Sequence, residues 1–305
     1  MTRATTRRLC ALALAAVAST AAHAETLIGL TSTNALVRFD SSMPTNASSP
    51  VTISGLASFN ERVIGIDLRP RTGVLYGLSD RGNLYTLNAT TGAATFVAGL
   101  VADPGDMTSP YAGLQGSSIG IDFNPVPDNN VSDPPSLRVM TNAGQNLRIN
   151  VNAPNVGRTL TDATLNGATS MLDAVAYSNN DRDPNTGTTL YGIDMATDTL
   201  YSLVANAGTS TAIGGLGVNT IGVAGFDISG ATRIAYAALT DGTTGKSGLY
   251  TLNLASGAAS WVGDFGIGGS TSIAPPLVDL TVAAIPEPGT YALMLAGLAM
   301  VGFSA

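Results

Sequence analysis

Three aspartates, Asp67, Asp122 and Asp227, recur at one position of a repeated apolar segment. If the repeats close around an axis, matching positions form a ring, and a ring of carboxylates can bind a cation or the hydroxyls of a sugar. The alternative is a folding role, in which each aspartate caps a turn or accepts backbone N–H bonds at a strand end. The copies of the segment are VIGIDLRP at 63–70, SIGIDFNP at 118–125 and, more loosely, VAGFDISG at 223–230.

Two arginines, Arg138 and Arg148, stand where other repeats carry aromatic residues. An arginine on an inner strand needs a partner if it is buried. We therefore expect these side chains to pair with Asp122 or Asp67. The alternative is that they bind a carboxylate or phosphate of a ligand.

The segment DRDPNTG at 181–187 has a spacing of oxygen ligands similar to that of calcium loops, with Asp181, Asp183 and Asn185 as candidate ligands. It departs from the EF-hand pattern because its glycine falls one place late and Gly192 stands where the final bidentate glutamate belongs. A solvated hairpin turn is the alternative. Calcium is thus the only cofactor that the sequence suggests, and otherwise we expect none.

The composition excludes much enzyme chemistry. Cys10 and His23 are the only cysteine and histidine, and both lie in a predicted signal peptide. The mature chain then has no Ser-His-Asp or Cys-His arrangement, no zinc site built on these residues and no histidine general base. Because only Glu25 and Glu61 precede the C-terminal motif, a catalytic pair would have to be built from aspartates. We predict that the protein is not an enzyme.

The chain is acidic, with a formal net charge of −7. An acidic surface disfavours nucleic acid and anionic membranes as partners. We therefore expect no nucleic-acid partner.

Five similar units follow one another between residues 25 and 285. Each reads as short strands joined by tight turns, and no helical periodicity of useful length appears. Four short antiparallel strands per unit around an axis is the plan of a β-propeller. We predict an all-β fold, a five-bladed propeller, with a two-sheet sandwich or an open β-solenoid as alternatives. The units open with LYGL at 75, LYGI at 190 and IAYA at 234, and more loosely with LIGL at 27 and LRVM at 137.

The first unit lacks its leading strand, and the strand-like stretch LVDLTVA at 277–283 is placed to supply it. We expect this C-terminal strand to close the ring.

The long loops 102–115 and 125–136 are rich in Pro, Gly, Asp and Asn. Long loops on a rigid scaffold are where binding surfaces usually lie.

The N-terminal 24 residues have the layout of a secretory signal. A basic start is followed by the apolar stretch 9–17, which is too short to span a bilayer, and by the cleavage pattern Ala22-His23-Ala24. We expect cleavage after Ala24 and a mature chain that begins at Glu25.

The C-terminal segment 286–305 begins with Pro286-Glu287-Pro288 and continues into the uncharged stretch YALMLAGLAMVGFSA. It resembles the PEP-CTERM sorting signal of exported bacterial proteins, without that pattern's final basic cluster. The resemblance implies recognition by an exosortase, cleavage near the Pro-Glu-Pro motif, and release to the cell surface or extracellular matrix of a Gram-negative bacterium. Membrane contact is then expected only through the tail before processing. We also expect a short hydrophobic helix at each terminus.

Residues 25–285 as a whole resemble an exported bacterial propeller-like domain of unknown function. The resemblance is carried by GIDLRP with LYGL and LYTLN, by GIDFNP with LRV, by TLYGID and by GFDI. It implies one domain and assigns no activity or ligand.

Two functions follow from these observations. The first is a non-catalytic surface or matrix protein whose rigid acidic domain binds polysaccharide or protein. The alternative is an extracellular hydrolase that acts on glycans through paired aspartates, which requires two inward carboxylates about 5–10 Å apart in one cleft.

Overall fold

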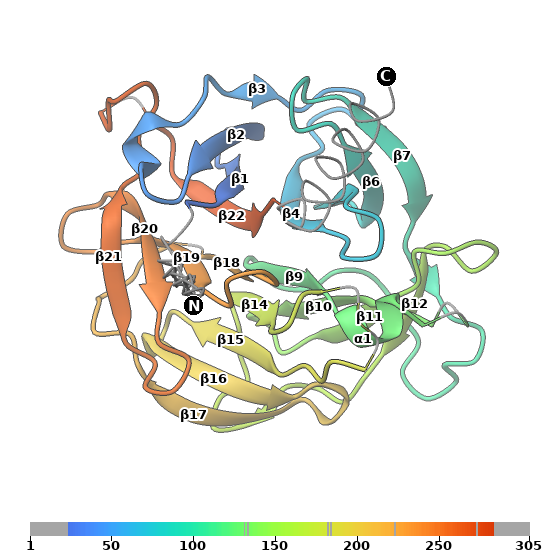
Figure 1. Cartoon of the computed structure of the whole chain (residues 1–305). Coiled ribbons are helices and arrows are strands. Elements are labelled where there is room, and N and C mark those ends of the chain that lie inside the picture. Colours follow the sequence, from blue (N-terminus) through green and yellow to red (C-terminus); the bar gives the residue numbers. More distant parts are fainter. Residues whose placement is uncertain are drawn as a thin grey trace, which may run out of the picture.

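Five small β-sheets surround one axis in the computed structural model (Figure 1), which describes residues 24–283 apart from 131, 133, 182, 184, 223 and 273. The predicted all-β, five-bladed propeller is confirmed. The sandwich and the solenoid are excluded because the five sheets follow one another in a closed ring. The signal peptide up to residue 23, the Pro-Glu-Pro motif and both predicted terminal helices lie outside the described residues. Within the described part, no helix has the length and apolar character needed to cross a membrane.

Each blade has four antiparallel strands, and blades 3 and 4 add a short parallel strand at the outer edge. From the axis outward, blade 1 is β22 (Leu277–Val282), β1 (Thr26–Thr31), β2 (Ala35–Asp40) and β3 (Val51–Thr52). Blade 2 is β4 (Val63–Leu68), β5 (Leu75–Ser79), β6 (Asn83–Leu87) and β7 (Ala94–Gly99). Blade 3 is β9 (Ile119–Phe123), β10 (Leu137–Thr141), β11 (Asn146–Ile149), β12 (Arg158–Thr161) and β8 (Val101–Ala102). Blade 4 is β14 (Ala174–Tyr177), β15 (Leu190–Asp194), β16 (Thr199–Val204), β17 (Thr209–Gly215) and β13 (Asn166–Gly167). Blade 5 is β18 (Gly225–Ile228), β19 (Ala235–Thr240), β20 (Ser247–Leu252) and β21 (Ala259–Asp264). The described helices are single turns: α1 (Pro125–Asp128), η1 (Pro44–Asn46) and η2 (Ala205–Ala207).

The C-terminal strand closes the ring, as the sequence predicted. β22 pairs antiparallel with β1, with Leu280 opposite Gly29. The innermost strands β22, β4, β9, β14 and β18 contact one another in turn, and β18 contacts β22. The first blade is therefore built from both ends of the domain (Figure 1).

The glycine of the repeated apolar segment lets neighbouring innermost strands approach closely. A Cβ added at Gly120 would lie 2.6 Å from the backbone nitrogen of Val175 on β14. A Cβ at Gly225 would lie 2.6 Å from backbone atoms of Asp279 on β22. Both distances are far below van der Waals contact, so only glycine fits where these neighbouring strands pack against each other.

The hydrophobic core is divided among the blade interfaces. The described residues form five buried apolar clusters, one between each pair of neighbouring blades. Between blades 2 and 3, for example, the rings of Tyr76 and Phe123 meet edge to face at 5.3 Å. Burial between blades on every side fixes the innermost strands, and with them the side chains that face the axis.

Candidate functional site at the propeller axis

The structure brings Asp67, Asp122 and Asp227 together at the axis. They occupy equivalent register positions on β4, β9 and β18, and each is about 1% exposed. One carboxylate oxygen from each lies within 4.8 Å of the other two. The equivalent position is Ala176 in blade 4 and Thr281 in blade 1, so the ring has three acidic members.

Hydrogen bonds give two of the three aspartates a folding role. Asp67 accepts from the backbone N–H of Phe123 at 2.7 Å, and Asp227 accepts from that of Val282 at 2.7 Å. Each bond links an innermost strand to the innermost strand of the next blade. The hydroxyl of Thr281 lies between these two carboxylates, 3.0 Å from Asp67 and 2.9 Å from Asp227. The predicted alternative, acceptance of backbone N–H bonds, is thus realised at these two positions.

Asp122 differs because neither of its carboxylate oxygens has a hydrogen-bond partner among the described residues. The backbone N–H of Tyr177, on the next blade, acts to lower the pKa of Asp122. It does not complete a hydrogen bond with either carboxylate oxygen. An unpartnered buried carboxylate is costly and calls for an explanation.

The environment of the ring opposes negative charge. Burial, with repulsion from Asp67 and Asp227, raises the pKa of Asp122 well above its usual range. Burial and repulsion from Asp227 do the same to the pKa of Asp67. Burial raises the pKa of Asp227 to about 6, against the hydrogen bonds that it accepts. Among the described residues, no arginine or lysine forms an ion pair with any of the three.

A fourth buried carboxylate, Asp279 on β22, lies near this group. Its Oδ2 accepts from the backbone N–H of Ile66 at 2.7 Å, and its Oδ1 accepts from that of Leu280 at 2.9 Å. Burial raises its pKa well above the usual range, and its charge adds to the repulsion on Asp67 and Asp122. Asp279 adds negative charge to the axis but has its own backbone partners.

The predicted pairing of the two arginines with Asp122 or Asp67 is wrong. Their partner is Asp162, which follows β12: Nη1 of Arg138 lies 2.6 Å from its Oδ2, and Arg148 binds both of its oxygens at 2.7 and 2.8 Å. Arg138 also donates to Asn146 and Asn206 at 2.8 Å. Arg138 is buried, so these internal bonds satisfy it as a structural residue of blade 3.

The predicted calcium ligands lie in the exposed loop between β14 and β15. Asp183 accepts from the backbone N–H of Asn185 at 2.9 Å, and Asp181 accepts from that of Asp183 at 2.8 Å. These bonds are the local turn pattern of Asp and Asn side chains. They match the hairpin-turn alternative and leave calcium binding there a prediction.

Both glutamates among the described residues, Glu25 and Glu61, are buried hydrogen-bond acceptors. Glu61 accepts from the side chains of Ser79, Asn83 and Tyr85, at 2.5, 2.8 and 2.9 Å. Glu25 accepts from three hydroxyls of blade 5, and therefore joins the first residue of the predicted mature chain to the last blade. Its partners are Ser229, Thr232 and Tyr236, at 2.5, 2.7 and 3.0 Å.

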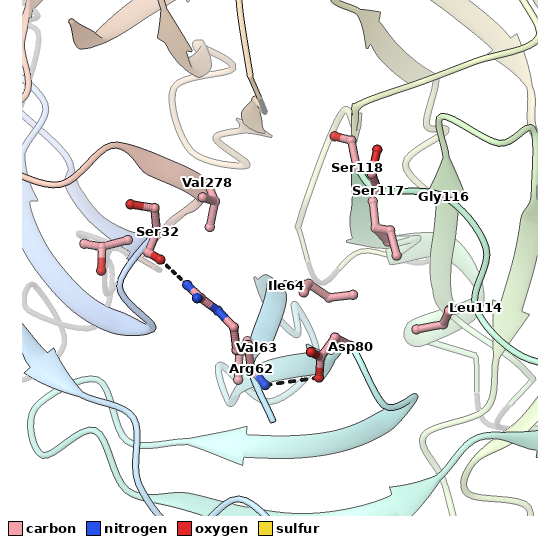
Figure 2. A pocket seen from close by; sticks show the side chains of 12 residues that line it. Ser32, Arg62, Val63, Ile64, Asp80, Leu114, Gly116, Ser117, Ser118 and Val278 are labelled. Atoms are coloured by element: carbon pink, nitrogen blue, oxygen red, sulfur yellow. Dashed lines mark hydrogen bonds between the residues drawn. The ribbon is translucent and has the colours of Figure 1, made fainter. Parts of the chain in front are cut away.

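A pocket of about 310 Å³ lies between blades 1, 2 and 3, where the innermost strands β22, β4 and β9 begin. Figure 2 shows Arg62 between Ser32 and Asp80 on one side of the pocket: the guanidinium donates to the carbonyl of Ser32, and the backbone N–H donates to Asp80 at 3.1 Å. Apolar contact surface comes from Ile64 and Leu114. The remaining lining residues are Thr31, Val63, Gly116, Ser117, Ser118, Ile119 and Val278.

The model of a domain of unknown function, DUF4394, matches residues 35–274. The chain belongs to the DUF4394 family. The PEP-CTERM protein-sorting motif matches residues 284–305, which confirms the predicted sorting signal. It marks this DUF4394 protein as an exported bacterial surface protein and implies processing by an exosortase-type enzyme.

Two solved structures are similar to this DUF4394 protein. One, titled a structural genomics protein of unknown function from Bacteroides thetaiotaomicron, is 13% identical with a TM-score of 0.46, covering 86% of this chain and 68% of its own. The other, titled a putative 6-phosphogluconolactonase from Bacteroides uniformis, is 14% identical with a TM-score of 0.39, covering 79% of this chain and 82% of its own. A comparison with curated proteins finds no match.

Sequence reasoning found three axial carboxylates of this DUF4394 protein but missed Asp279 and the pocket. Asp279 lies two residues before the repeated position, which Thr281 occupies in blade 1, so alignment of the repeats does not mark it. A buried strand with an internal aspartate, LVDLTV, is the signal that points to it.

The pocket has no motif, since three blades each contribute only a few residues to it. The loop 102–115, predicted as a binding surface, supplies Leu114, whereas the loop 125–136 is anchored at Asp128 by a 2.6 Å ion pair with Arg69.

Proposed function

We propose that this exported surface protein is a non-catalytic binding module, and that the pocket between blades 1, 2 and 3 binds a sugar unit of a surface or matrix polysaccharide. The composition of the pocket carries the proposal. A sugar presents hydroxyls together with apolar C–H faces, and the pocket offers both kinds of partner. Arg62 and Asp80 supply charged hydrogen-bonding groups, Ser32 and Ser117 supply hydroxyls, and Ile64 supplies an apolar contact.

The size and position of the pocket support the same function. Its volume of about 310 Å³ lies at the lower end of the range for small-molecule sites, which suits one sugar residue. It is held by residues at the start of β4 and β9, whose strands are fixed by blade packing. A preorganised pocket loses little conformational entropy when a ligand binds.

The hydrolase alternative draws no support from the described residues. A pair of carboxylates flanking a glycosidic bond must reach the substrate. Asp80 is the one carboxylate in the described lining of the pocket. The three axial aspartates are about 1% exposed, so a glycan chain has no access to them. Absence of catalysis remains a prediction, tested by assaying glycan turnover alongside binding.

The test measures retention of the purified mature chain on exopolysaccharide from a bacterium that makes the protein, followed by calorimetry with its fragments. Ser117→Trp fills the pocket and Arg62→Ala removes its cation. The matched controls are Ser49→Trp and Arg81→Ala, since both of these side chains are exposed outside the lining.

We expect each pocket variant to weaken binding at least about 10-fold, which corresponds to about 1.4 kcal/mol, while both controls bind as the wild type does. Equal binding by all four variants would reject the pocket as the site. Failure of the wild type to bind any polysaccharide fraction would reject the function.

A further inference from the structure

The axial aspartates have the geometry of a cation site. Their nearest oxygens all lie within 4.8 Å of one another. Three oxygens spaced evenly around one Ca²⁺ ion at the usual Ca–O distance of about 2.3–2.6 Å lie about 4.0–4.5 Å apart. The observed spacing is therefore within a few tenths of an ångström of that of a shared ion, and a small rotation of the carboxylates would let one ion contact Asp67, Asp122 and Asp227 at once.

The orphaned carboxylate of Asp122 points to a ligand independently of the cluster. Asp122 is about 1% exposed, and both of its oxygens lack a hydrogen-bond partner among the described residues. Buried polar atoms in native proteins almost always have a partner, and a bound ion is one accepted explanation of an exception. Since an oxygen of this side chain lies with those of Asp67 and Asp227, the missing partner belongs between the three.

The surrounding charges leave the cluster uncompensated. Asp279 faces it from β22, and Glu25 is close enough to repel Asp227. The hydroxyl of Tyr177 lies 3.3 Å from Arg138, whose charge is already paired with Asp162. The Thr281 hydroxyl has one proton and so satisfies one carboxylate at a time. Buried carboxylates in this number require a counterion or bound protons.

We propose that Asp67, Asp122 and Asp227 bind one Ca²⁺ ion at the propeller axis. The available ligands are all oxygen atoms, which suit hard cations and not zinc. Mg²⁺ is less suited, because it requires near-ideal octahedral geometry at about 2.0–2.1 Å and keeps several waters, and this site is buried. An exported protein meets Ca²⁺ outside the cell, where sites of modest affinity are filled. The ion ties together blades 2, 3 and 5 at their innermost strands.

The experiment compares the mature chain refolded from denaturant with Ca²⁺, with Mg²⁺ or with EDTA, because a buried site is filled most readily while the chain folds. Bound metal is counted by elemental mass spectrometry after dialysis, and thermal unfolding is followed in each condition. Asp122→Asn removes the unpartnered ligand. Asp183→Asn is the matched control, since it alters the other calcium candidate, the loop at 181–187.

We expect one Ca²⁺ per chain in the wild type and in Asp183→Asn, and a higher unfolding temperature with Ca²⁺ than with Mg²⁺ or EDTA. Asp122→Asn should weaken Ca²⁺ binding at least about 10-fold, because even outer-shell changes weaken metal sites by about 10–100-fold. In EDTA, Asp122→Asn should unfold at the same temperature as the wild type or higher, since it removes one uncompensated charge. In Ca²⁺ the order should reverse.

Three results would overturn the proposal. The first is a wild type that retains no Ca²⁺ and shows no thermal response to it. The second is an Asp122→Asn variant destabilised equally with and without Ca²⁺, which would indicate a folding role alone. The third is loss of the ion from Asp183→Asn and not from Asp122→Asn, which would place it in the loop.

Discussion

Replacement of Glu61 by glutamine tests how much a single buried acceptor stabilises blade 2. Glu61 is 4% exposed and precedes β4. Its Oε1 accepts three side-chain hydrogen bonds, and its Oε2 accepts one from the backbone N–H of Ser58 at 2.9 Å. Burial alone would raise its pKa, but the hydrogen bonds from Ser79, Asn83, Tyr85 and Ser58 together lower it below the usual value of 4.5.

The expected loss follows from the change in each bond. A hydrogen bond to a charged group contributes about 1.5–3 kcal/mol and one between neutral groups about 1 kcal/mol, so three bonds each weaken by roughly 0.5–2 kcal/mol. The new amide NH₂ also faces the N–H of Ser58 and leaves that donor without an acceptor, at about 1 kcal/mol or more. The lower ends of these figures give a fall of about 3 kcal/mol in the free energy of unfolding. For a domain of this size, that fall corresponds to a drop of about 6–12 °C in the unfolding temperature.

The pH dependence of that loss has a definite sign. Because the folded pKa of Glu61 lies below the unfolded value, its contribution is fully present above about pH 4.5 and disappears as pH falls through the folded pKa. The difference in unfolding temperature between wild type and Glu61→Gln should thus be constant from about pH 6 upward and shrink toward pH 3. Calorimetry across this range measures it, with the exposed Asp183→Asn as control. A difference that is the same at pH 3 and pH 7 would refute the role assigned to the charge.

Three further substitutions test other parts of the fold by thermal or denaturant unfolding. Gly120→Ala forces a Cβ to within 2.6 Å of the β14 backbone, so we expect a loss of several kcal/mol, whereas Gly187→Ala, which has open space, should change stability by less than about 0.5 kcal/mol. Leu280→Ala, at the closing strand, should cost about 2–5 kcal/mol through its cavity, and a loss below 1 kcal/mol would contradict tight ring closure. Asp162→Asn leaves Arg138 and Arg148 without a counter-charge, and should cost about 3–5 kcal/mol because Arg138 and Asp162 are buried; a loss below 1 kcal/mol would contradict this role.

The fold was predictable because each blade repeats the same local pattern. LYTLN at 84–88 and at 249–253 forms β6 and β20, the third strand of blades 2 and 5 in order from the axis. The missing first strand and the strand-like stretch at 277–283 together indicated closure. These features are local in sequence, so alternation of apolar residues and turn chemistry suffice to identify them.

The details of the axis could not be predicted in the same way. Repeat symmetry placed Asp67, Asp122 and Asp227 at equivalent positions but did not show that only Asp122 lacks a donor. Which acid neutralises Arg138 depends on how the residues after β12 reach across blade 3, and no repeat position marks Asp162. An interaction that occurs in only one repeat cannot be predicted by aligning the repeats with one another.

The order of segments along the chain relates folding to export. The closing strand β22 ends at Val282, and the sorting motif matches from residue 284. Cleavage near Pro286-Glu287-Pro288 therefore leaves the closing strand in the domain, so removal of the tail does not open the first blade. Conversely, the ring cannot close until residues 277–282 are available to pair with β1, because β22 is the inner neighbour of β1 among the described strands. If the axial Ca²⁺ binds as proposed, the same closure completes its site, because it brings β18 and β4 to either side of β22.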